Sequence, residues 1–245
     1  MSFRLPTTEE KAIYVQDQFE RIARRYDLTN DVISLGMHRF WKERAVDGLS
    51  LVPEGRYLDV CCGTGDLALS VARRLSSRGQ VTGVDFSRNM LAVAGRRAGL
   101  AGERALVKAR LVWLEADAEN LPFDDGSFDG AIISFGLRNL TNMQKGLSEM
   151  ARVVRPGGRV VNLDVGKPTL PVFAPLFHLY FRQVVPIIGE ILQSDRQAYT
   201  YLPESAQAYP PPEEISAIFR SAGLSKVVHQ ALALGSVALH SGTVT

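Results

Sequence analysis

The sequence predicts a single α/β domain with a mostly parallel, seven-stranded sheet, an antiparallel strand near its C-terminal end and a helical lid. Three observations support this fold class. Short apolar runs alternate with amphipathic segments of helical period, which is typical of a parallel sheet covered by helices on both faces. A glycine-containing turn follows the first apolar run, and a long apolar insertion later interrupts the alternation. With 245 residues, 46% of them hydrophobic, the chain is large enough for one full core.

The predicted domain, residues 1–245, has four parts. A helical N-terminal segment covers 1–50, and the core of the sheet covers 51–165. The lid insertion covers 166–212, and a helix followed by a hairpin covers 213–245. The last two apolar runs are separated by so few residues that they can pair only as a hairpin, so one strand is expected to be antiparallel.

Short apolar runs between turn residues predict the strands. The expected ranges are Tyr57–Cys61, Gln80–Asp85, Leu111–Glu115, Phe128–Ser134, Arg159–Asp164, Lys226–Ala231 and Ser236–His240. Apolar residues at helical spacing predict the helices. Their expected ranges are Glu9–Tyr26, Asp66–Leu75, Asn89–Ala98, Met143–Val153 and Glu213–Ala222. The tripeptide Pro156-Gly157-Gly158 predicts a tight turn before the fifth strand.

The stretch YLDVCCGTGDL, Tyr57–Leu67, predicts a buried strand, a sharp turn and the start of a helix. Gly63 and Gly65 carry no Cβ, so a ligand can approach this turn closely. The helix behind the turn directs free backbone N–H groups toward that ligand. Asp85 ends the second predicted strand, where a carboxylate is placed to accept hydrogen bonds from a ribose. The pattern therefore predicts a nucleoside site.

Two nucleoside cofactors fit this geometry. The range Gly63–Ala68 matches the dinucleotide pattern G-x-G-x-x-A, which favours NAD. Asp59 and Asp66 favour the other cofactor, because carboxylates repel a pyrophosphate and attract the amino group of a methionine moiety. We therefore expect S-adenosylmethionine, and keep NAD and a purely structural strand–turn–helix unit as alternatives.

Composition and charge narrow the function classes. A net charge of +2 favours no polyanionic partner, so no nucleic acid is expected. Adjacent Cys61 and Cys62 are expected to be small buried residues, with a catalytic thiol as the alternative, and the four histidines show no metal spacing. The N-terminal residues lack a signal-peptide pattern, and no run reaches the roughly 18 apolar residues of a membrane span. We expect a cytoplasmic protein without a metal.

Three further segments each leave two interpretations open. Arg21, Arg24 and Arg25 form a basic cluster, which is either a solvated face or a contact with an anionic membrane surface. The range Tyr26–Lys42 mixes polar and aromatic residues, as either a packed connector or a functional segment does. The insertion 166–212 is either extra core or one or two helices over the carboxyl ends of the strands, where ligands bind in such sheets. An apolar lid favours an apolar acceptor.

Six motifs follow one another over nearly the whole chain. The less specific ones are LDVCCGTGDL (Leu58–Leu67), LPFDDGSFD (Leu121–Asp129) and RVVRPGGRVV (Arg152–Val161). The more specific ones are FERIARRYDLTNDVISLGMHRFWK (Phe19–Lys42), ISFGLRNL (Ile133–Leu140) and AYTYLPESAQAYP (Ala198–Pro210). Together they resemble the ubiquinone/menaquinone biosynthesis C-methyltransferases. The chain departs from the wider methyltransferase pattern at Cys61, where Gly is common, and Asp164 lies in a stretch where many relatives carry Glu-Phe-Ser.

The resemblance implies a class I, Rossmann-like methyltransferase that transfers a methyl group from S-adenosylmethionine to a ring carbon of a prenylated quinol. The most specific expectation is demethylmenaquinol in menaquinone biosynthesis. Ubiquinone-branch or phylloquinone-branch acceptors, another small molecule, and a non-catalytic scaffold are the alternatives. A polyprenyl substrate resides in the bilayer, so transient contact with the inner face of the plasma membrane is expected, and a homodimer is left open. The implied cofactor-binding residues are Gly63, Thr64, Gly65, Asp85, Asp117, Ala118 and Ser134.

The same resemblance directs attention to the acceptor. A phenolate is a far better carbon nucleophile than a neutral quinol, whose hydroxyl has a pKa of about 10. Arg138 is expected to stabilise this oxyanion or to orient a water that takes the proton, because a guanidinium is a poor base; a surface ion pair is the alternative. Asn139 is expected to position a quinol oxygen, with His38 and Tyr201 also at the substrate. The candidates for the base are His38, Asp31, His178 and Tyr201.

Overall fold

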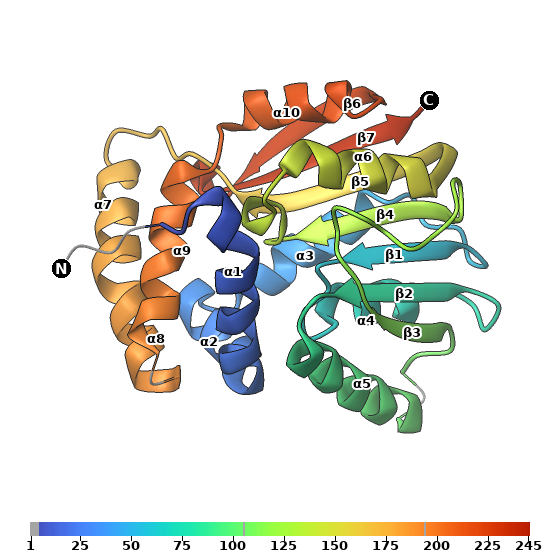
Figure 1. Ribbon diagram of the computed structural model, residues 1–245, viewed down its shortest axis with the longest axis horizontal. Helices are drawn as coiled ribbons and strands as arrows, with labels where there is room; N and C mark the ends of the chain where they lie inside the picture. Colours follow the sequence, from blue (N-terminus) through green and yellow to red (C-terminus); the bar gives the residue numbers. More distant parts are fainter. Residues whose placement is uncertain (1–4, 105, 194) are drawn as a thin grey trace.

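The computed structural model describes residues 5–104, 106–193 and 195–245, and the side chains of Arg196 and Gln197 are not described. The first four residues of the predicted N-terminal segment, residue 105 of the predicted core and residue 194 of the predicted lid therefore lie outside the described residues. Within the described part, the chain forms a seven-stranded sheet in the order β3-β2-β1-β4-β5-β7-β6 (Figure 1). This order agrees with the predicted fold class.

Strands β1 to β5 run parallel, as the alternation of apolar runs predicted. Their bounds, with those of the last two strands, are β1 (Arg56–Val60), β2 (Gln80–Asp85), β3 (Arg110–Glu115), β4 (Phe128–Ser134), β5 (Val154–Val165), β6 (Leu224–Leu232) and β7 (Val237–Val244). The antiparallel strand is β7, which pairs with both β5 and β6. It therefore lies one place inside the sheet, and the edge strand is β6.

The helices of the described part surround this sheet. They are α1 (Thr8–Ile22), α2 (Tyr26–Ser34), α3 (Met37–Asp47), α4 (Asp66–Arg74), α5 (Arg88–Glu103), α6 (Met143–Val153), α7 (Phe173–Leu179), α8 (Val185–Gln193), α9 (Arg196–Ala208) and α10 (Pro212–Ser221). The sheet buries both faces, because side chains alternate along each strand. Leu58 and Val60 of β1 pack into a cluster with α6 and α10, whereas Tyr57 packs with α3 and α4. In Figure 1, α6 lies in front of the sheet and α3 and α4 lie behind it.

Two predicted boundaries were wrong. The single N-terminal helix expected over Glu9–Tyr26 is broken by a 3₁₀ turn, Ala23–Arg25, after which α2 continues. The fifth strand begins at Val154, and Pro156-Gly157-Gly158 forms a bulge inside it. Five residues of β5 advance while β4 advances by two, from the Phe128–Val154 pair to the Gly130–Arg159 pair. Gly157 has a φ of +83°, which a residue without a Cβ adopts at little cost.

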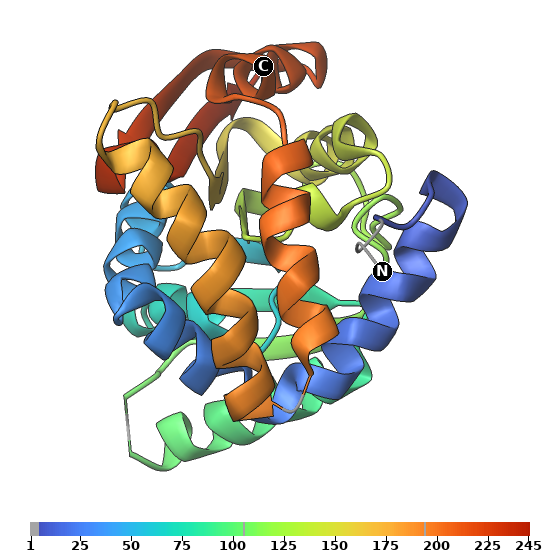
Figure 2. The same ribbon diagram turned by 90° about the vertical axis from the view of Figure 1, so that its left-hand side faces the viewer.

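The insertion 166–212 forms the expected lid. Helices α7 and α8 are joined by a π-helical segment, Tyr180–Val184, and α9 packs beside α8. The approach is close, since a Cβ on Gly189 would lie 2.2 Å from the ring of Tyr199. Figure 2 faces these helices and shows them beside α1 and α2, although more than a hundred residues separate the two segments.

Hydrogen bonds fix the lid to the N-terminal helices. The Gln18 side chain donates to the carbonyl of Ala198, and Arg25 donates to the carbonyl of Leu192. Arg21 pairs with Asp195 at 2.9 Å. Two of the three arginines of the predicted basic cluster are therefore engaged with the lid, so the cluster is partly structural.

Candidate active site

A cavity of about 440 Å³ lies at the carboxyl ends of β1, β2 and β4. Ligands bind at this edge in parallel α/β sheets, because the strand order reverses there and leaves a crevice. The strands deliver most of its polar lining directly. The predicted residues that line it are Gly63, Asp85, Asp117, Ala118, Ser134 and Asn139.

The glycine turn closes one side of this cavity. Gly63 and Gly65 have φ values of +54° and +81°, the left-handed region that the predicted sharp turn requires. Gly65 also has no room for a side chain, because a Cβ would lie 2.7 Å from the ring of Trp113. Cys61 has a φ of +54° as well, which gives a physical reason why Gly is common at this position in related sequences.

Asp85 is held at the end of β2 by the turn itself. One carboxylate oxygen accepts the Gly63 N–H at 2.8 Å, and the other accepts the Ser87 N–H at 2.9 Å. The side chain is nearly fully buried, and burial raises the pKa of its carboxyl to about 6 despite these hydrogen bonds. A carboxylate fixed in this way, on the wall of a cavity, suits the hydroxyls of a ribose.

Ser134 supplies a second sign that a polar ligand fits here. Its hydroxyl is buried at the end of β4, lines the cavity and has no hydrogen-bond partner among the described residues. A buried hydroxyl without a partner costs stability unless a ligand or water satisfies it. Asp117 accepts the Glu119 N–H, which holds its carboxylate near Ala118, and Ala118 leaves room for a flat ring.

The structure does not bring all expected cofactor residues to the cavity wall. Thr64 and Gly65 do not line it, and the Thr64 hydroxyl donates to Asp27 at 2.6 Å. Their predicted contacts with the cofactor therefore stay predictions.

The two acidic residues that favoured a cationic amino acid are also engaged elsewhere. Asp59 accepts the Ala68 N–H, and burial raises its pKa to about 8, which favours the neutral acid. Asp66 pairs with Lys42 and Arg97. Burial alone would raise its pKa, but these two cations outweigh burial and hold it below the ordinary range. Neither carboxylate lines the cavity, so that part of the argument for the cofactor was wrong.

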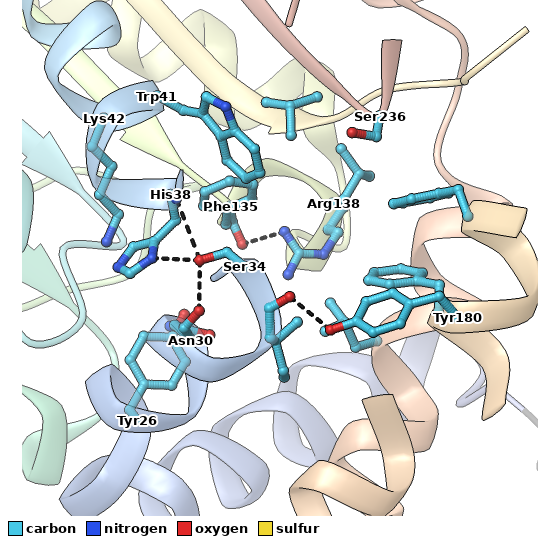
Figure 3. A pocket seen from close by; sticks show the side chains of 16 residues that line it. Tyr26, Asn30, Ser34, His38, Trp41, Lys42, Phe135, Arg138, Tyr180 and Ser236 are labelled. Atoms are coloured by element: carbon cyan, nitrogen blue, oxygen red, sulfur yellow. Dashed lines mark hydrogen bonds between the residues drawn. The ribbon is translucent and has the colours of Figure 1, made fainter. Parts of the chain in front are cut away.

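A second cavity, of about 130 Å³, adjoins the first and is mostly apolar (Figure 3). Its walls come from α2, α3, the loop after β4 and the lid. Tyr26 and Phe135 line both cavities, so the two spaces meet at these rings. The further lining residues are Asn30, Ile33, Ser34, His38, Trp41, Lys42, Arg138, Val165, Phe177, Tyr180, Phe181, Leu202, Ser236 and Val237.

Arg138 is the buried cation of the second cavity. Its Nη1 donates to Asp164 at 2.7 Å and to the carbonyl of Phe135 at 2.6 Å. The partner Asp164 is almost completely buried, so the surface ion pair considered from the sequence was wrong, and the pair is an internal one. Burial opposes the charge, but Asp164 raises the pKa of Arg138 further. The buried Nε has no partner among the described residues, which leaves one N–H donor available for a ligand oxygen.

Of the three expected substrate residues, only His38 lines the second cavity. Its Nδ1 lies 2.7 Å from the Ser34 hydroxyl. Asn139 lines the first cavity, and its side-chain oxygen accepts from the Tyr201 hydroxyl at 3.2 Å. Tyr201 is buried beside a third cavity, of about 220 Å³, that Arg138 also borders. Neither Asn139 nor Tyr201 therefore lines the apolar cavity.

Sequence reasoning missed several residues of the second cavity. Ser34, Phe135 and Tyr180 line it, and none was singled out. Phe135 could have been found, since it directly follows the predicted strand-end residue Ser134. Ser34 and Tyr180 carried no signal, because they come together only through packing of the lid against α2, where Tyr180 donates to the carbonyl of Ile33.

The described residues show neither a metal-binding cluster nor a membrane-spanning helix. Over residues 5–104, 106–193 and 195–245, no group of His, Cys, Asp and Glu side chains is arranged to hold a metal ion. In the same part of the chain, no helix is both long and apolar enough to cross a membrane.

This fold, with a ligand cavity at the strand ends, is also seen in solved methyltransferases. An S-adenosylmethionine-dependent methyltransferase from Thermotoga maritima, described as a possible histamine N-methyltransferase, matches with a TM-score of 0.63 and 19% identity, over 94% of this chain and 99% of that one. Phosphoethanolamine N-methyltransferase 2 from Haemonchus contortus, solved with S-adenosyl-L-methionine, matches with a TM-score of 0.62 and 19% identity, over 94% of this chain and 59% of that one. At such low identity, these matches establish the fold, which is that of S-adenosylmethionine-dependent methyltransferases.

Sequence relatives narrow the class. A demethylmenaquinone methyltransferase from Desulfitobacterium hafniense (strain Y51) is 44% identical over 234 residues, 96% of this chain and 91% of that protein. A mitochondrial 2-methoxy-6-polyprenyl-1,4-benzoquinol methylase from Arabidopsis thaliana is 42% identical over 248 residues, 95% of this chain and 85% of that protein. The ubiE/COQ5 methyltransferase family matches residues 7–244. The chain belongs to this family and is an S-adenosylmethionine-dependent methyltransferase, as its motifs predicted.

Proposed function

We propose that this methyltransferase methylates a ring carbon of a prenylated quinol, and that its acceptor is demethylmenaquinol. One observation carries the proposal: an apolar cavity containing a buried arginine meets the cofactor cavity at Tyr26 and Phe135. A flat, apolar ring with an ionisable oxygen fits such a space. The relatives named for demethylmenaquinone and for a polyprenyl benzoquinol support the same class of acceptor.

The strand-end cavity would hold the methyl donor. Asp85 would accept from the ribose hydroxyls, Asp117 and Ala118 would border the adenine, and Ser134 would close the site near the sulfonium. The glycine turn, Gly63–Gly65, would leave space for the methionine end beside Thr64. The donor supplies an activated methyl group, so the remaining demand falls on the acceptor, which must become a phenolate.

Arg138 is the residue we assign to that demand. A fixed positive charge in an apolar cavity stabilises a phenolate far more than it would in water. Its unpartnered Nε gives the oxyanion a hydrogen-bond donor. Asp164 keeps the guanidinium in place, and Asn139, bonded to Tyr201, supports the loop on which Arg138 lies. We assign Asn139 and Tyr201 to positioning the loop around the acceptor.

Product analysis tests this function. The protein is incubated with S-adenosylmethionine and a mixture of demethylated naphthoquinols and benzoquinols, and the methylated products are identified by mass spectrometry. We expect methylnaphthoquinol as the main product. Methylated benzoquinol alone would move the enzyme to the ubiquinone branch, and no methylated quinol at all would overturn the proposal. As a check on the cofactor, S-adenosylhomocysteine should raise the melting temperature, and NAD should not.

We also propose that the lid face contacts the membrane in which a polyprenyl quinol resides. Exposed apolar side chains gather around the α2–α3 turn and on α7 and α8. The two regions adjoin, because the Tyr180 hydroxyl, between α7 and α8, donates to the carbonyl of Ile33 in α2. Leu35 is 87% exposed and Val172 is 77% exposed. Leu35 directly follows α2 and Val172 directly precedes α7, two helices that line the acceptor cavity. An acceptor ring could therefore enter from this face while its prenyl tail stays in lipid.

Vesicle flotation tests the membrane contact. We expect the protein to float with anionic vesicles at low salt, and to do so less after Leu35→Asp and Val172→Asp. Val228→Asp is the matched control, because Val228 is 59% exposed on the edge strand β6. A protein that stays in the soluble fraction at low salt, with or without quinol, would contradict this contact.

A further inference from the structure

The acceptor cavity contains a serine and a histidine in direct contact. The hydroxyl of Ser34 lies 2.7 Å from Nδ1 of His38 and 2.7 Å from the carbonyl oxygen of Asn30 (Figure 3). Ser34 and His38 both line the cavity that Arg138 also lines. Figure 3 shows the Ser34 hydroxyl between the imidazole ring and the guanidinium.

The turn between α2 and α3 creates this contact. Leu35 and Gly36 both take left-handed conformations, with φ of 51° and 75°, so the chain reverses between the two helices. Ser34, the last residue of α2, then meets the first turn of α3. The Ser34 hydroxyl also accepts the backbone N–H of His38, but at the longer distance of 3.3 Å. Turn capping therefore accounts for the serine, whereas it does not require a buried histidine.

The surroundings of the ring favour one tautomer. Nε2 of His38 lies 3.8 Å from Asp31 and 4.0 Å from Asp66, both carboxylates. An N–H on Nε2 faces these oxygens favourably, so that Nδ1 is free to accept a proton. The Ser34 hydroxyl has one proton, which it donates to the Asn30 carbonyl at 2.7 Å, and Nδ1, at the same distance, competes with that carbonyl for it. If Nδ1 then gains that proton, the imidazolium lies beside two negative charges, with Lys42 and Arg39 as the opposing cations.

The other candidates for the base are poorly placed. Tyr201 is outside the acceptor cavity, and burial raises its pKa to about 12. Asp31 is engaged by two hydrogen bonds from Arg39 and does not line the cavity. His178 is exposed and borders a neighbouring cavity. Among the four, His38 alone lines the acceptor cavity, where it contacts Ser34.

We propose that Ser34 and His38 form a proton relay that deprotonates the acceptor, an inference that rests on the proposed function. The quinol hydroxyl gives its proton to Ser34 Oγ, and Ser34 gives its own proton to Nδ1 of His38. The resulting phenolate carbon forms a bond to the methyl group, while the S–CH₃ bond breaks and sulfur keeps the electron pair. The ring carbon then loses its hydrogen as a proton to water, and His38 returns its proton to the quinol oxygen through Ser34. One proton is released overall.

The resting protonation state suits this role. Burial lowers the pKa of His38 below its ordinary value, and Lys42 and Arg39 lower it further, against the opposing effect of Asp66 and Asp31. The ring is therefore neutral at pH 7 and can accept a proton. Ser34 touches the acceptor, whereas His38 acts through it, so His38 is a positioning and proton-accepting residue.

Two variants test the relay in the full-length enzyme. His38→Gln keeps a polar group near Ser34 but accepts no proton, and Ser34→Ala removes the connection. We expect each to lower kcat about 10²- to 10³-fold, which lies within the range of general acid–base catalysis, with S-adenosylhomocysteine affinity by calorimetry unchanged. His178→Gln is the matched control, since it removes an exposed histidine beside the neighbouring cavity, and it should leave kcat unchanged.

The pH profile separates a relay from a structural role. In the wild type, kcat should increase with pH below 6.5, as His38 loses its proton, and then stay constant. This increase is the limb of the pH profile that reports on His38. In His38→Gln, that limb should disappear, and the rate should rise only toward the quinol's own pKa of about 10. A merely structural role would lower the melting temperature and leave the limb in place, which would overturn the relay.

The acidity of the acceptor gives a second readout, which remains valid even if part of the His38→Gln protein is unfolded. For quinols with more acidic hydroxyls, the ratio of wild-type to His38→Gln rates should shrink, because the base is needed less. A constant ratio across the series would overturn the relay. The proposed function is judged separately: wild type that methylates no quinol refutes the function, whereas wild type that is active with His38→Gln equally active refutes the relay alone.

Discussion

The two cavities of this enzyme are built by different means. The cofactor cavity is made at the ends of β1, β2 and β4, and backbone N–H groups fix its main carboxylate, Asp85. The acceptor cavity is made by α2, α3 and the lid, which come from opposite parts of the chain. Its charged groups are fixed by other side chains, as in the Arg138–Asp164 pair.

This difference predicts that mutations can alter cofactor binding and the chemical step independently of each other. A change at a strand end should alter cofactor binding and leave the chemistry of the bound complex largely intact. A change among the helices should alter the chemical step and leave cofactor binding intact. Tyr26 and Phe135, which line both cavities, are the places where this separation should fail.

The largest effect is expected at Arg138. Arg138→Ala should lower kcat about 10²- to 10³-fold, because one oxyanion contact is lost, while the dissociation constant of S-adenosylmethionine stays the same. It should also lower the free energy of unfolding by about 3–5 kcal/mol, since Asp164 is left buried without its partner. Steady-state kinetics, calorimetry and urea unfolding measure the three quantities. In Arg138→Ala, the increase of kcat with pH should also occur at higher pH than in the wild type, because the phenolate forms less easily without the positive charge.

A second variant separates the two roles of Arg138. Arg138→Met combined with Asp164→Asn removes both buried charges, so it should recover much of the lost stability while kcat stays low. Arg138→Lys should restore part of the rate, because an ammonium lacks the planar fork. If the double variant regains wild-type kcat, Arg138 is a structural residue, and the oxyanion needs another partner.

A smaller effect, on the other cavity, is expected from Asp85→Ala. Loss of a charge-assisted hydrogen bond costs about 1.5–3 kcal/mol, which corresponds to a dissociation constant for S-adenosylmethionine weaker by about 10- to 150-fold. At saturating cofactor, kcat should remain within about threefold of wild type, because the acceptor groups are untouched. Calorimetry and kinetics on the same preparation test this. An unchanged dissociation constant would remove Asp85 from the binding site.

The same difference explains what the sequence could and could not predict. Asp85 and Ser134 each end a predicted strand and Asp117 follows another, and parallel strands end at one edge, so their meeting was foreseeable. The parallel direction of β1 to β5 followed from the same alternation, whereas the order β3-β2-β1-β4-β5-β7-β6 was not predicted. The prediction that Asp59 would face the cofactor was wrong, because the side chains of β1 alternate between the two faces of the sheet and Asp59 points away from the cavity. A shift of one residue along the strand would place it on the other face.

The acceptor side was harder for a physical reason. Ser34 and His38 meet only because two consecutive left-handed residues reverse the chain, and Leu35 gives no warning of that conformation. Asp164 was noted from its sequence context, but its pairing with Arg138 spans 26 residues and depends on the register of β4 against β5. Such contacts follow from packing, which local patterns do not contain.

The pH dependence of cofactor binding should show an effect of about tenfold. Burial raises the pKa of Asp85 to about 6, above its value of about 4 in the unfolded chain. Its charged form is the one that accepts from ribose hydroxyls, so affinity should be constant above pH 6 and fall about tenfold per unit below it. Asp85→Asn should abolish this dependence.

Because a raised carboxyl pKa means tighter proton binding in the folded state, this group stabilises the fold at low pH and loses that contribution as pH rises through 6.

The smallest effect is expected at Cys61, which tests whether strain at the end of β1 matters to either cavity. Its φ of +54° costs a residue with a Cβ about 1–2 kcal/mol, whereas Gly pays about 0.5–1 kcal/mol of backbone entropy on folding. Cys61→Gly should therefore change the free energy of unfolding by no more than about 1 kcal/mol and leave kcat and cofactor affinity at wild-type values. Cys61→Ala is the control that keeps the strain and removes the thiol. Cys61→Val should destabilise the protein most, because a branched Cβ fits a left-handed conformation poorly and because Gly136 packs closely against this position. A clear loss of kcat in both the Gly and the Ala variants would instead show that the thiol takes part in the reaction. The cofactor cavity would then contain a reactive group in addition to the groups that bind the cofactor.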